Sequence, residues 1–132
     1  METGGHLVAI VDDDAGVLRA LGRVVRSLGF ETVTYPTGEA FLSALGARVP
    51  TCAILDQHLP GLTGLETFEA LRGSAQRIPA MIIITAHDES GLAERCLAAG
   101  VAAYIQKPVD DEALRDALET ACNPESDRQT DT

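Results

Sequence analysis

The stretch LVAIVDDD, residues 7–14, joins five apolar residues directly to three aspartates. Four more short apolar runs follow along the chain. Most of the runs are almost continuously apolar, which is typical of strands that helices cover on both faces of a parallel sheet. The run at 32–35 alternates in polarity and predicts an edge strand. The five predicted strands are 7–11, 32–35, 52–55, 81–85 and 101–105.

In the segments between these runs, apolar residues recur with the spacing of an amphipathic helix. Gly29 and Gly100 predict the ends of the first and fourth helices, and Asp14 and Asp88 are candidate N-caps of the same two helices. Strands that alternate with helices predict an α/β protein whose parallel sheet has helices on both faces. The predicted helices are 15–28, 37–45, 65–71, 88–99 and 110–121, and the polar residues 123–132 are expected to form a frayed tail.

The composition narrows the possible classes of function. The chain has 132 residues, which suits one domain, and its formal net charge of −10 argues against direct binding to nucleic acid or to anionic membranes. It has neither a signal peptide nor an apolar run long enough to cross a membrane, so we expect a cytoplasmic protein. Cys52, Cys96 and Cys122 are too few and too scattered for a disulfide framework or a zinc site, and we interpret them as small apolar residues in a reducing compartment.

Polar residues stand at the ends of the predicted strands. In parallel sheets these ends meet at one edge, where the functional site lies. Each residue alone has an ordinary explanation such as helix capping, turn formation or solvation, but several carboxylates in one place repel each other unless cations are present. One lysine supplies a single positive charge, so we expect a divalent metal as well. The residues are Asp12, Asp13, Asp14, Asp56, Thr85 and Lys107.

The donors at this edge favour phosphate chemistry. Hard oxygen ligands prefer Mg²⁺ (or Mn²⁺) to zinc, and Mg²⁺ on one or two carboxylates is the form that handles phosphate. A carboxylate can itself accept a phosphoryl group. We therefore predict that Asp56 is the acceptor, with charge neutralisation from the metal and Lys107 and a hydrogen bond from Thr85.

The chain resembles response-regulator receiver domains over residues 7–121. The resemblance rests on four motifs that occur in order, VDDD at 11–14, LDQHLPGLTGLE at 55–66, IIITA at 82–86 and YIQKP at 104–108. It implies a flavodoxin-like, doubly wound (βα)5 fold whose five-stranded parallel sheet has the order 2-1-3-4-5. The expected organisation is an N-terminal extension at 1–6, a receiver domain at 7–121 and a flexible C-terminal tail at 122–132.

The resemblance also implies a role for each residue of the site. Asp56 is the expected phosphoacceptor and Lys107 and Thr85 its catalytic partners. The expected metal ligands, with Asp13 the most direct of the acid pair, are Asp12, Asp13, Asp56 and the backbone carbonyl of His58.

Further residues are expected to act in the switch. Thr85 and Tyr104 match the hydroxyl and the aromatic side chain that move together, and Ala86 matches the small residue that leaves access to the phosphoryl group. The Lys107–Pro108 peptide bond is expected to be cis. His58 and His87 occupy the variable positions that tune how fast the phosphoryl group hydrolyses; the alternative is that both are exposed loop residues with no role.

The implied function is a phosphorylation-dependent signalling switch rather than an enzyme, with intrinsic autophosphorylation from small donors and autodephosphorylation. A sensor histidine kinase or a His phosphotransfer protein is the expected donor, and the kinase partner is expected to dock near the helix that begins at Ala15. A downstream protein is expected on the face formed by 88–121, with no direct nucleic-acid or membrane contact and a monomer or weak dimer. The chain is interpreted as a stand-alone receiver; the alternatives are a receiver fragment of a longer helix-turn-helix transcriptional regulator and a phosphorelay intermediate.

Three competing classes fit the residues less well. A haloacid-dehalogenase-like phosphatase requires a second aspartate at position 58, which is His58 here. A flavodoxin-like cofactor binder requires a loop rich in Ser, Thr and Gly after the first strand, whereas this chain has aspartates at 12–14. A degenerate receiver that works only by protein contact is disfavoured by the intact set of Asp13, Asp56, Thr85 and Lys107.

Overall fold

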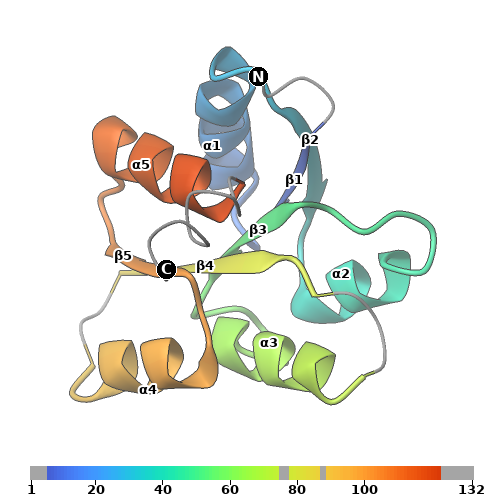
Figure 1. The fold of residues 1–132 in the computed structure, drawn as a ribbon, viewed down its shortest axis with the longest axis vertical. Helices are drawn as coiled ribbons and strands as arrows, with labels where there is room; N and C mark the ends of the chain where they lie inside the picture. Colours follow the sequence, from blue (N-terminus) through green and yellow to red (C-terminus); the bar gives the residue numbers. More distant parts are fainter. Residues whose placement is uncertain (1–5, 75–77, 87–88, 123–132) are drawn as a thin grey trace, which may run out of the picture.

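The computed structural model describes residues 6–74, 78–86 and 89–122, which form five consecutive β–α units (Figure 1). The strands are β1 (Leu7–Val11), β2 (Glu31–Tyr35), β3 (Cys52–Asp56), β4 (Ala80–Thr85) and β5 (Ala103–Gln106), and the helices are α1 (Ala15–Ser27), α2 (Gly38–Ala44), α3 (Gly64–Arg72), α4 (Leu92–Ala99) and α5 (Asp111–Ala121). Among the residues so described, no helix is long and apolar enough to cross a membrane.

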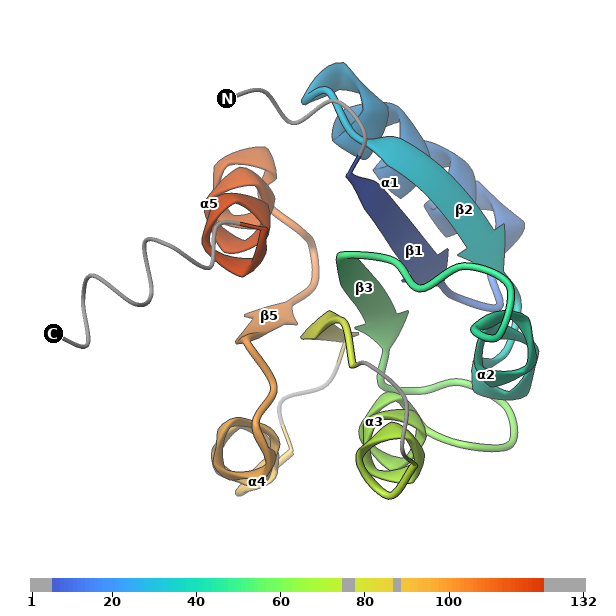
Figure 2. The same ribbon diagram turned by 45° about the vertical axis from the view of Figure 1, so that its right-hand side comes forward.

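All neighbouring strands are parallel, and their order is β2-β1-β3-β4-β5. This order confirms the doubly wound sheet, and it confirms that β2 is an edge strand. Figure 2 shows α1 and α5 on one face of the sheet and α2, α3 and α4 on the other. The strand order reverses between β1 and β3, so the carboxyl ends of these two central strands lie side by side.

Two apolar clusters, one on each face, explain why the central strands are continuously apolar. Side chains alternate between the faces along a strand. In β4, Ile82 and Ile84 pack with α1 and α5, whereas Met81 and Ile83 pack with α2, α3 and α4. The strands β1 and β3 alternate in the same way. Because both faces are covered, every position between the strand ends has to be apolar.

Side-chain caps set most of the helix starts. The Asp14 side chain accepts hydrogen bonds from Gly16 N and Val17 N, which confirms it as the N-cap of α1. The N-caps of α2 and α5 are Thr37 and Asp110, and α3 begins with a reciprocal capping box between a threonine and a glutamate.

Two predicted boundaries were wrong. The fourth helix begins at Leu92 with Gly91 as its N-cap, not at Asp88, which lies outside the described residues. Gly91 has a φ of 80°, a conformation that glycine adopts without strain, and it separates the loop from the helix. The last strand begins at Ala103 rather than Val101, because Val101 N donates to Cys96 O and closes the end of α4.

Helices α2 and α3 approach closely at one glycine. A Cβ atom at Gly38 would collide with the Oγ1 of Thr67, a fully buried residue whose hydroxyl donates to Thr63 O at 2.8 Å. Thr67 therefore has no freedom to move away without losing this bond. The absence of a side chain at Gly38 lets the two helices pack together on the same face of the sheet.

We expect Gly38→Ala to lower the free energy of unfolding by about 1–3 kcal/mol, because the added methyl group overpacks this contact. The measurement is urea denaturation followed by circular dichroism. Gly46→Ala is the matched control, because a Cβ atom at Gly46 meets no atom within 4 Å, and its effect should stay within about 1 kcal/mol. Equal effects of the two substitutions would contradict the packing argument.

Candidate functional site

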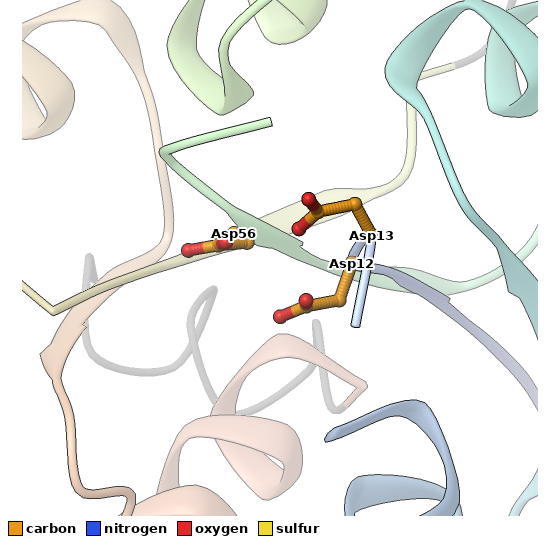
Figure 3. A group of neighbouring side chains, drawn as sticks. All are labelled: Asp12, Asp13 and Asp56. Carbon is orange, nitrogen blue, oxygen red and sulfur yellow. The ribbon is translucent and has the colours of Figure 1, made fainter. Parts of the chain in front are cut away.

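Three carboxylates converge where β1 and β3 end. Asp12 and Asp13 follow β1 directly, and Asp56 is the last residue of β3. One carboxylate oxygen from each lies within 4.8 Å of the others (Figure 3). Asp12 and Asp56 are 3% and 7% exposed, whereas Asp13 is exposed. The structure thus brings together the three acidic residues that were predicted from the strand ends.

Lys107, just beyond β5, reaches the same carboxylates. Its Nζ lies 3.5 Å from Asp12 Oδ2 and 3.6 Å from Asp56 Oδ1. Its backbone N–H donates to Thr85 O at 2.7 Å, which ties it to the end of β4. One ammonium therefore lies near two almost buried carboxylates.

The ionised form of Asp12 is disfavoured in the folded protein. Burial raises the pKa of Asp12, and the negative charge of Asp56 raises it further. The backbone N–H of Asp14, which donates to Asp12 Oδ1 at 2.9 Å, opposes the shift, as does Lys107. The net direction is upward because burial, together with the charge of Asp56, outweighs these two stabilising contacts.

The loop after Asp56 is held by two residues that the sequence analysis did not single out. Gln57 is 7% exposed, its N–H donates to Ile84 O at 2.7 Å, and its side-chain Oε1 accepts a hydrogen bond from Leu65 N at 2.9 Å. A Cβ atom at Gly64 would lie 2.9 Å from Asp56 O, so only glycine lets α3 start this close to the aspartate. The position of Gln57 directly after Asp56 could have drawn attention to it. Its hydrogen bonds, however, depend on how α3 and β4 pack against this loop.

Thr85 is fully buried at the end of β4, next to the end of β3. The strand register pairs Asp56 with Ile84, which puts Thr85 one residue further along the neighbouring strand. Tyr104 in β5 pairs with Ile83 and packs partly buried on the cluster formed with α2, α3 and α4. Ala86 is exposed. The Lys107–Pro108 peptide bond is cis, as the resemblance implies.

One of the two histidines predicted to flank the site can be placed. The side chain of His58 is 39% exposed, and its Nε2 lies 3.7 Å from Glu89 Oε2, in the segment that leads to α4. This contact joins the loop after β3 to the loop after β4 and becomes an ion pair when His58 is protonated. His87 lies outside the described residues.

The donor set fits a hard divalent cation. Three carboxylate oxygens lie within 4.8 Å of one another, and among the described residues this is the one group of three His, Cys, Asp or Glu side chains close enough to hold an ion. Oxygen donors without sulfur or imidazole nitrogen match Mg²⁺. A cation at this point would also offset the charge that Lys107 leaves unbalanced.

Residues 8–119 match the response regulator receiver domain family. The response regulator protein TmoT of Ectopseudomonas mendocina is 35% identical over 87% of this chain. The transcriptional regulatory protein FixJ of Bradyrhizobium diazoefficiens is 31% identical over 92% of it. The chain spans only 52% and 58% of the lengths of these two relatives.

Solved structures agree with the fold. A response regulator receiver protein from Burkholderia phymatum is 40% identical, and it superposes with a TM-score of 0.76 over 89% of this chain and 95% of its own. The order of strands and the helices on both faces are therefore those of a known architecture.

The burial of Asp12 predicts a defined pH dependence of stability in metal-free buffer. The folded protein binds the Asp12 proton more tightly than the unfolded chain, whose Asp12 has the ordinary pKa of 3.8. The stabilisation from protonated Asp12 is thus complete below about pH 3.8 and is lost as the pH rises through the higher folded pKa. We expect the free energy of unfolding of the wild type minus that of Asp12→Asn to fall across this window and then level off.

The measurement is urea denaturation in the presence of a chelator at a series of pH values. Asp116→Asn, which removes an exposed carboxylate of α5, is the control for the change in net charge. A difference between wild type and Asp12→Asn that rises with pH would contradict the direction of the shift.

Proposed function

The chain belongs to the response regulator receiver domain family, and on this basis we propose that it is a phosphorylation switch in which Asp56 accepts the phosphoryl group. Receiver domains are the signalling domains of two-component systems that histidine kinases phosphorylate. The observation that carries the proposal is the position of the Asp56 carboxylate, nearly buried at the end of β3, within 4.8 Å of Asp12 and Asp13 oxygens and 3.6 Å from the Lys107 ammonium.

In the proposed transfer, an Asp56 carboxylate oxygen bonds to phosphorus while the bond from phosphorus to the donor's histidine nitrogen breaks. Lys107 is close enough to counter the negative charge on Asp56 and on the incoming phosphoryl oxygens. Positioning and charge neutralisation account for most of the catalysis of phosphoryl transfer. The chain is proposed to act as an acceptor that also takes phosphoryl groups from small donors and hydrolyses its own acyl phosphate, rather than as an enzyme with a separate substrate.

The proposed metal is Mg²⁺ or Mn²⁺, held by Asp12, Asp13, Asp56 and the backbone carbonyl of His58, with Asp13 the more direct ligand of the acid pair. Receiver domains bind Mg²⁺ at such an acidic pocket. The metal, when bound, supplies positive charge to the phosphoryl oxygens. The chain's own contribution is to hold the carboxylates in place: Asp12 through the N–H of Asp14, and the chain after Asp56 through Gln57.

The proposed signal passes through Thr85 and Tyr104. A phosphoryl group adds about −1.5 to −2 charges and new hydrogen-bond acceptors at this edge. The Thr85 hydroxyl is the proposed donor to it, and Tyr104 is proposed to move inward as Thr85 moves toward the phosphoryl group. Lys107 N donates a hydrogen bond to Thr85 O, so the end of β4 is linked to the first residue of the loop that leads into α5. The face formed by 88–121 is the proposed surface for a downstream protein.

A sensor histidine kinase or a His phosphotransfer protein is the proposed donor. The chain spans little more than half of the relatives TmoT and FixJ, and the second of these is named a transcriptional regulator. This favours, as an alternative to a stand-alone receiver, a receiver segment of a longer transcriptional regulator that would contact DNA through another domain. A phosphorelay intermediate is the remaining alternative.

We expect the wild-type chain to gain the mass of one phosphoryl group when it is incubated with acetyl phosphate and Mg²⁺, and to gain none with a chelator present. Asp56→Asn should abolish the gain, because an amide cannot form the acyl phosphate. The measurement is intact-protein mass spectrometry.

Asp14→Asn is the matched control, because Asp14 is an exposed neighbour of the cluster and asparagine retains the N-cap oxygen of α1. It should be phosphorylated like the wild type. Phosphorylation of Asp56→Asn to the wild-type level would contradict the proposal that Asp56 is the acceptor.

The lifetime of the phosphoryl group is proposed to depend on His58 and His87. His58 follows Asp56 by two residues, and its Nε2 lies 3.7 Å from Glu89 Oε2. Its ring is proposed to limit the approach of water to the phosphoryl group. We expect the double substitution of both histidines by alanine to speed acyl-phosphate hydrolysis several-fold, measured as the decay of the phosphorylated mass after the donor is removed. His6→Ala is the control, because the His6 ring is hydrogen-bonded to the Thr51 hydroxyl at the amino ends of the strands, away from Asp56. An unchanged decay rate would leave both histidines without this role.

A further inference from the structure

Three arginines lie along one side of α1. Arg19, Arg23 and Arg26 are exposed and follow each other at spacings of four and three residues, which places them on the same side of the helix. The chain has ten lysines and arginines and a formal net charge of −10, and α1 itself contains no acidic residue. Among the described residues, none of the three arginines forms an ion pair with a carboxylate. This side of α1 is therefore a positive surface on an otherwise acidic protein.

The arginines border a hollow beside the edge strand β2, which runs next to α1 (Figure 2). The hollow has a volume of about 280 Å³, and Leu18 and Thr34 line it together with the three arginines. Thr34 belongs to β2, and the hydroxyl of Thr32 in the same strand accepts a hydrogen bond from Arg26 Nη1 at 3.2 Å. Val33, between the two threonines, packs on the opposite face of the sheet. The α1 face of β2 is thus polar and lies within reach of the arginines.

The outer edge of β2 offers backbone hydrogen-bonding groups. The N–H of Glu31 and the C=O of Tyr35 bond to the residues that flank β1. Because these groups alternate between the two edges of a strand, the N–H and C=O of Thr32 and Thr34 point away from β1. In the part of the chain that the structure describes, β2 pairs with β1 alone. An edge of this kind is a template for a further strand.

The spacing of the arginines suits an extended chain laid along β2. Arg19 and Arg26 are about 10 Å apart along the helix axis, with Arg23 between them. A strand added at the open edge would lie about 4.8 Å from β2, and its alternate side chains would point to the α1 face at intervals of about 6.6 Å. Three acidic residues at alternate positions span about 13 Å, so their carboxylates can reach the three arginines. The guanidinium group binds carboxylates through two parallel hydrogen bonds.

The positive side chains and the open edge point to the same ligand. The arginines alone would also attract a phosphate, but a phosphate would leave the open edge of β2 unused. A nucleic acid is disfavoured by the formal net charge of −10. An acidic peptide segment uses both features, because main-chain hydrogen bonds to a strand edge supply affinity and side chains supply specificity.

We propose that the outer edge of β2 and the three arginines of α1 form a docking surface for a partner protein that contributes an extended segment with acidic residues at alternate positions. The segment adds to the five-stranded sheet as a further strand, through the backbone of Thr32 and Thr34, and the arginines select its acidic side chains. β2 and β5 are opposite edges of the sheet. This surface is therefore separate from the face formed by 88–121 and does not depend on the role proposed for Asp56.

The test uses fluorescence anisotropy to measure binding of the 132-residue chain to a fluorescein-labelled peptide in which three glutamates alternate with threonines. The buffer has low ionic strength and contains neither a phosphoryl donor nor a metal, so the result is independent of phosphorylation. We expect saturable binding, and no binding of the matched peptide with lysine in place of glutamate. In NMR spectra of the chain, the glutamate peptide should shift the backbone amide signals of Thr32 and Thr34 more than those of β5.

Two double variants test the arginines. Arg19→Gln combined with Arg23→Gln should weaken binding roughly fivefold, because two exposed ion pairs with the peptide are lost. Arg95→Gln combined with Arg115→Gln removes the same charge from exposed positions of α4 and α5 and should leave binding unchanged. Equal weakening by the two double variants would overturn the proposal, because binding would then respond only to net charge.

Two methylated peptides test the backbone hydrogen bonds. Successive N–H groups of a strand point to opposite edges, so N-methylation of the glutamates and N-methylation of the threonines remove donors from different edges of the peptide. One methylated peptide should bind about tenfold more weakly than the unmodified peptide, and the other should bind like it. Thr34→Pro removes an outward donor of β2 that β1 does not use, and it should weaken binding as well.

The absence of saturable binding to the glutamate peptide would overturn the proposal. Equal binding of both methylated peptides and the unmodified one would do the same, because only charge attraction would then remain. If Thr34→Pro does not fold, the methylated peptides still test the same hydrogen bonds.

Discussion

The repulsion between Asp12, Asp13 and Asp56 is the constraint on which the rest of this molecule depends. Helices cover both faces of the sheet that brings them together, and two of the three carboxylates, those of Asp12 and Asp56, are nearly buried near a single ammonium. Carboxylates this close together lower the stability of the fold unless hydrogen bonds or cations offset their repulsion. The N–H of Asp14 and the hydrogen bonds of Gln57 hold the two loops despite that repulsion. A site with incompletely neutralised charge responds strongly to an added cation or phosphoryl group, which is what a switch requires.

Most of the architecture could be predicted from the sequence because the signals are local. The apolar runs that end in Asp12 and Asp56 are continuous, and a parallel sheet brings their carboxyl ends together whatever the lengths of the loops. The start of α4 was mispredicted because an aspartate at 88 is a sound capping signal, while the glycine at 91 that precedes the helix carries no such signal. The buried position of Gln57 could not be predicted, since it depends on hydrogen bonds to Ile84 of β4, far away in the chain, and to Leu65 at the start of α3.

Gly64 has a consequence for recognising this kind of site in other chains. A side chain there would meet the carbonyl oxygen of Asp56 at 2.9 Å, so the aspartate and the glycine eight positions later form a single steric unit. An aspartate after a buried strand is common in α/β proteins, because it also serves as a turn former. The same aspartate followed at this spacing by a glycine at the start of a helix is a far rarer coincidence. The pair is therefore a more selective signature than the acidic residue alone, and a chain with a larger residue at that position must have displaced either the helix or the loop.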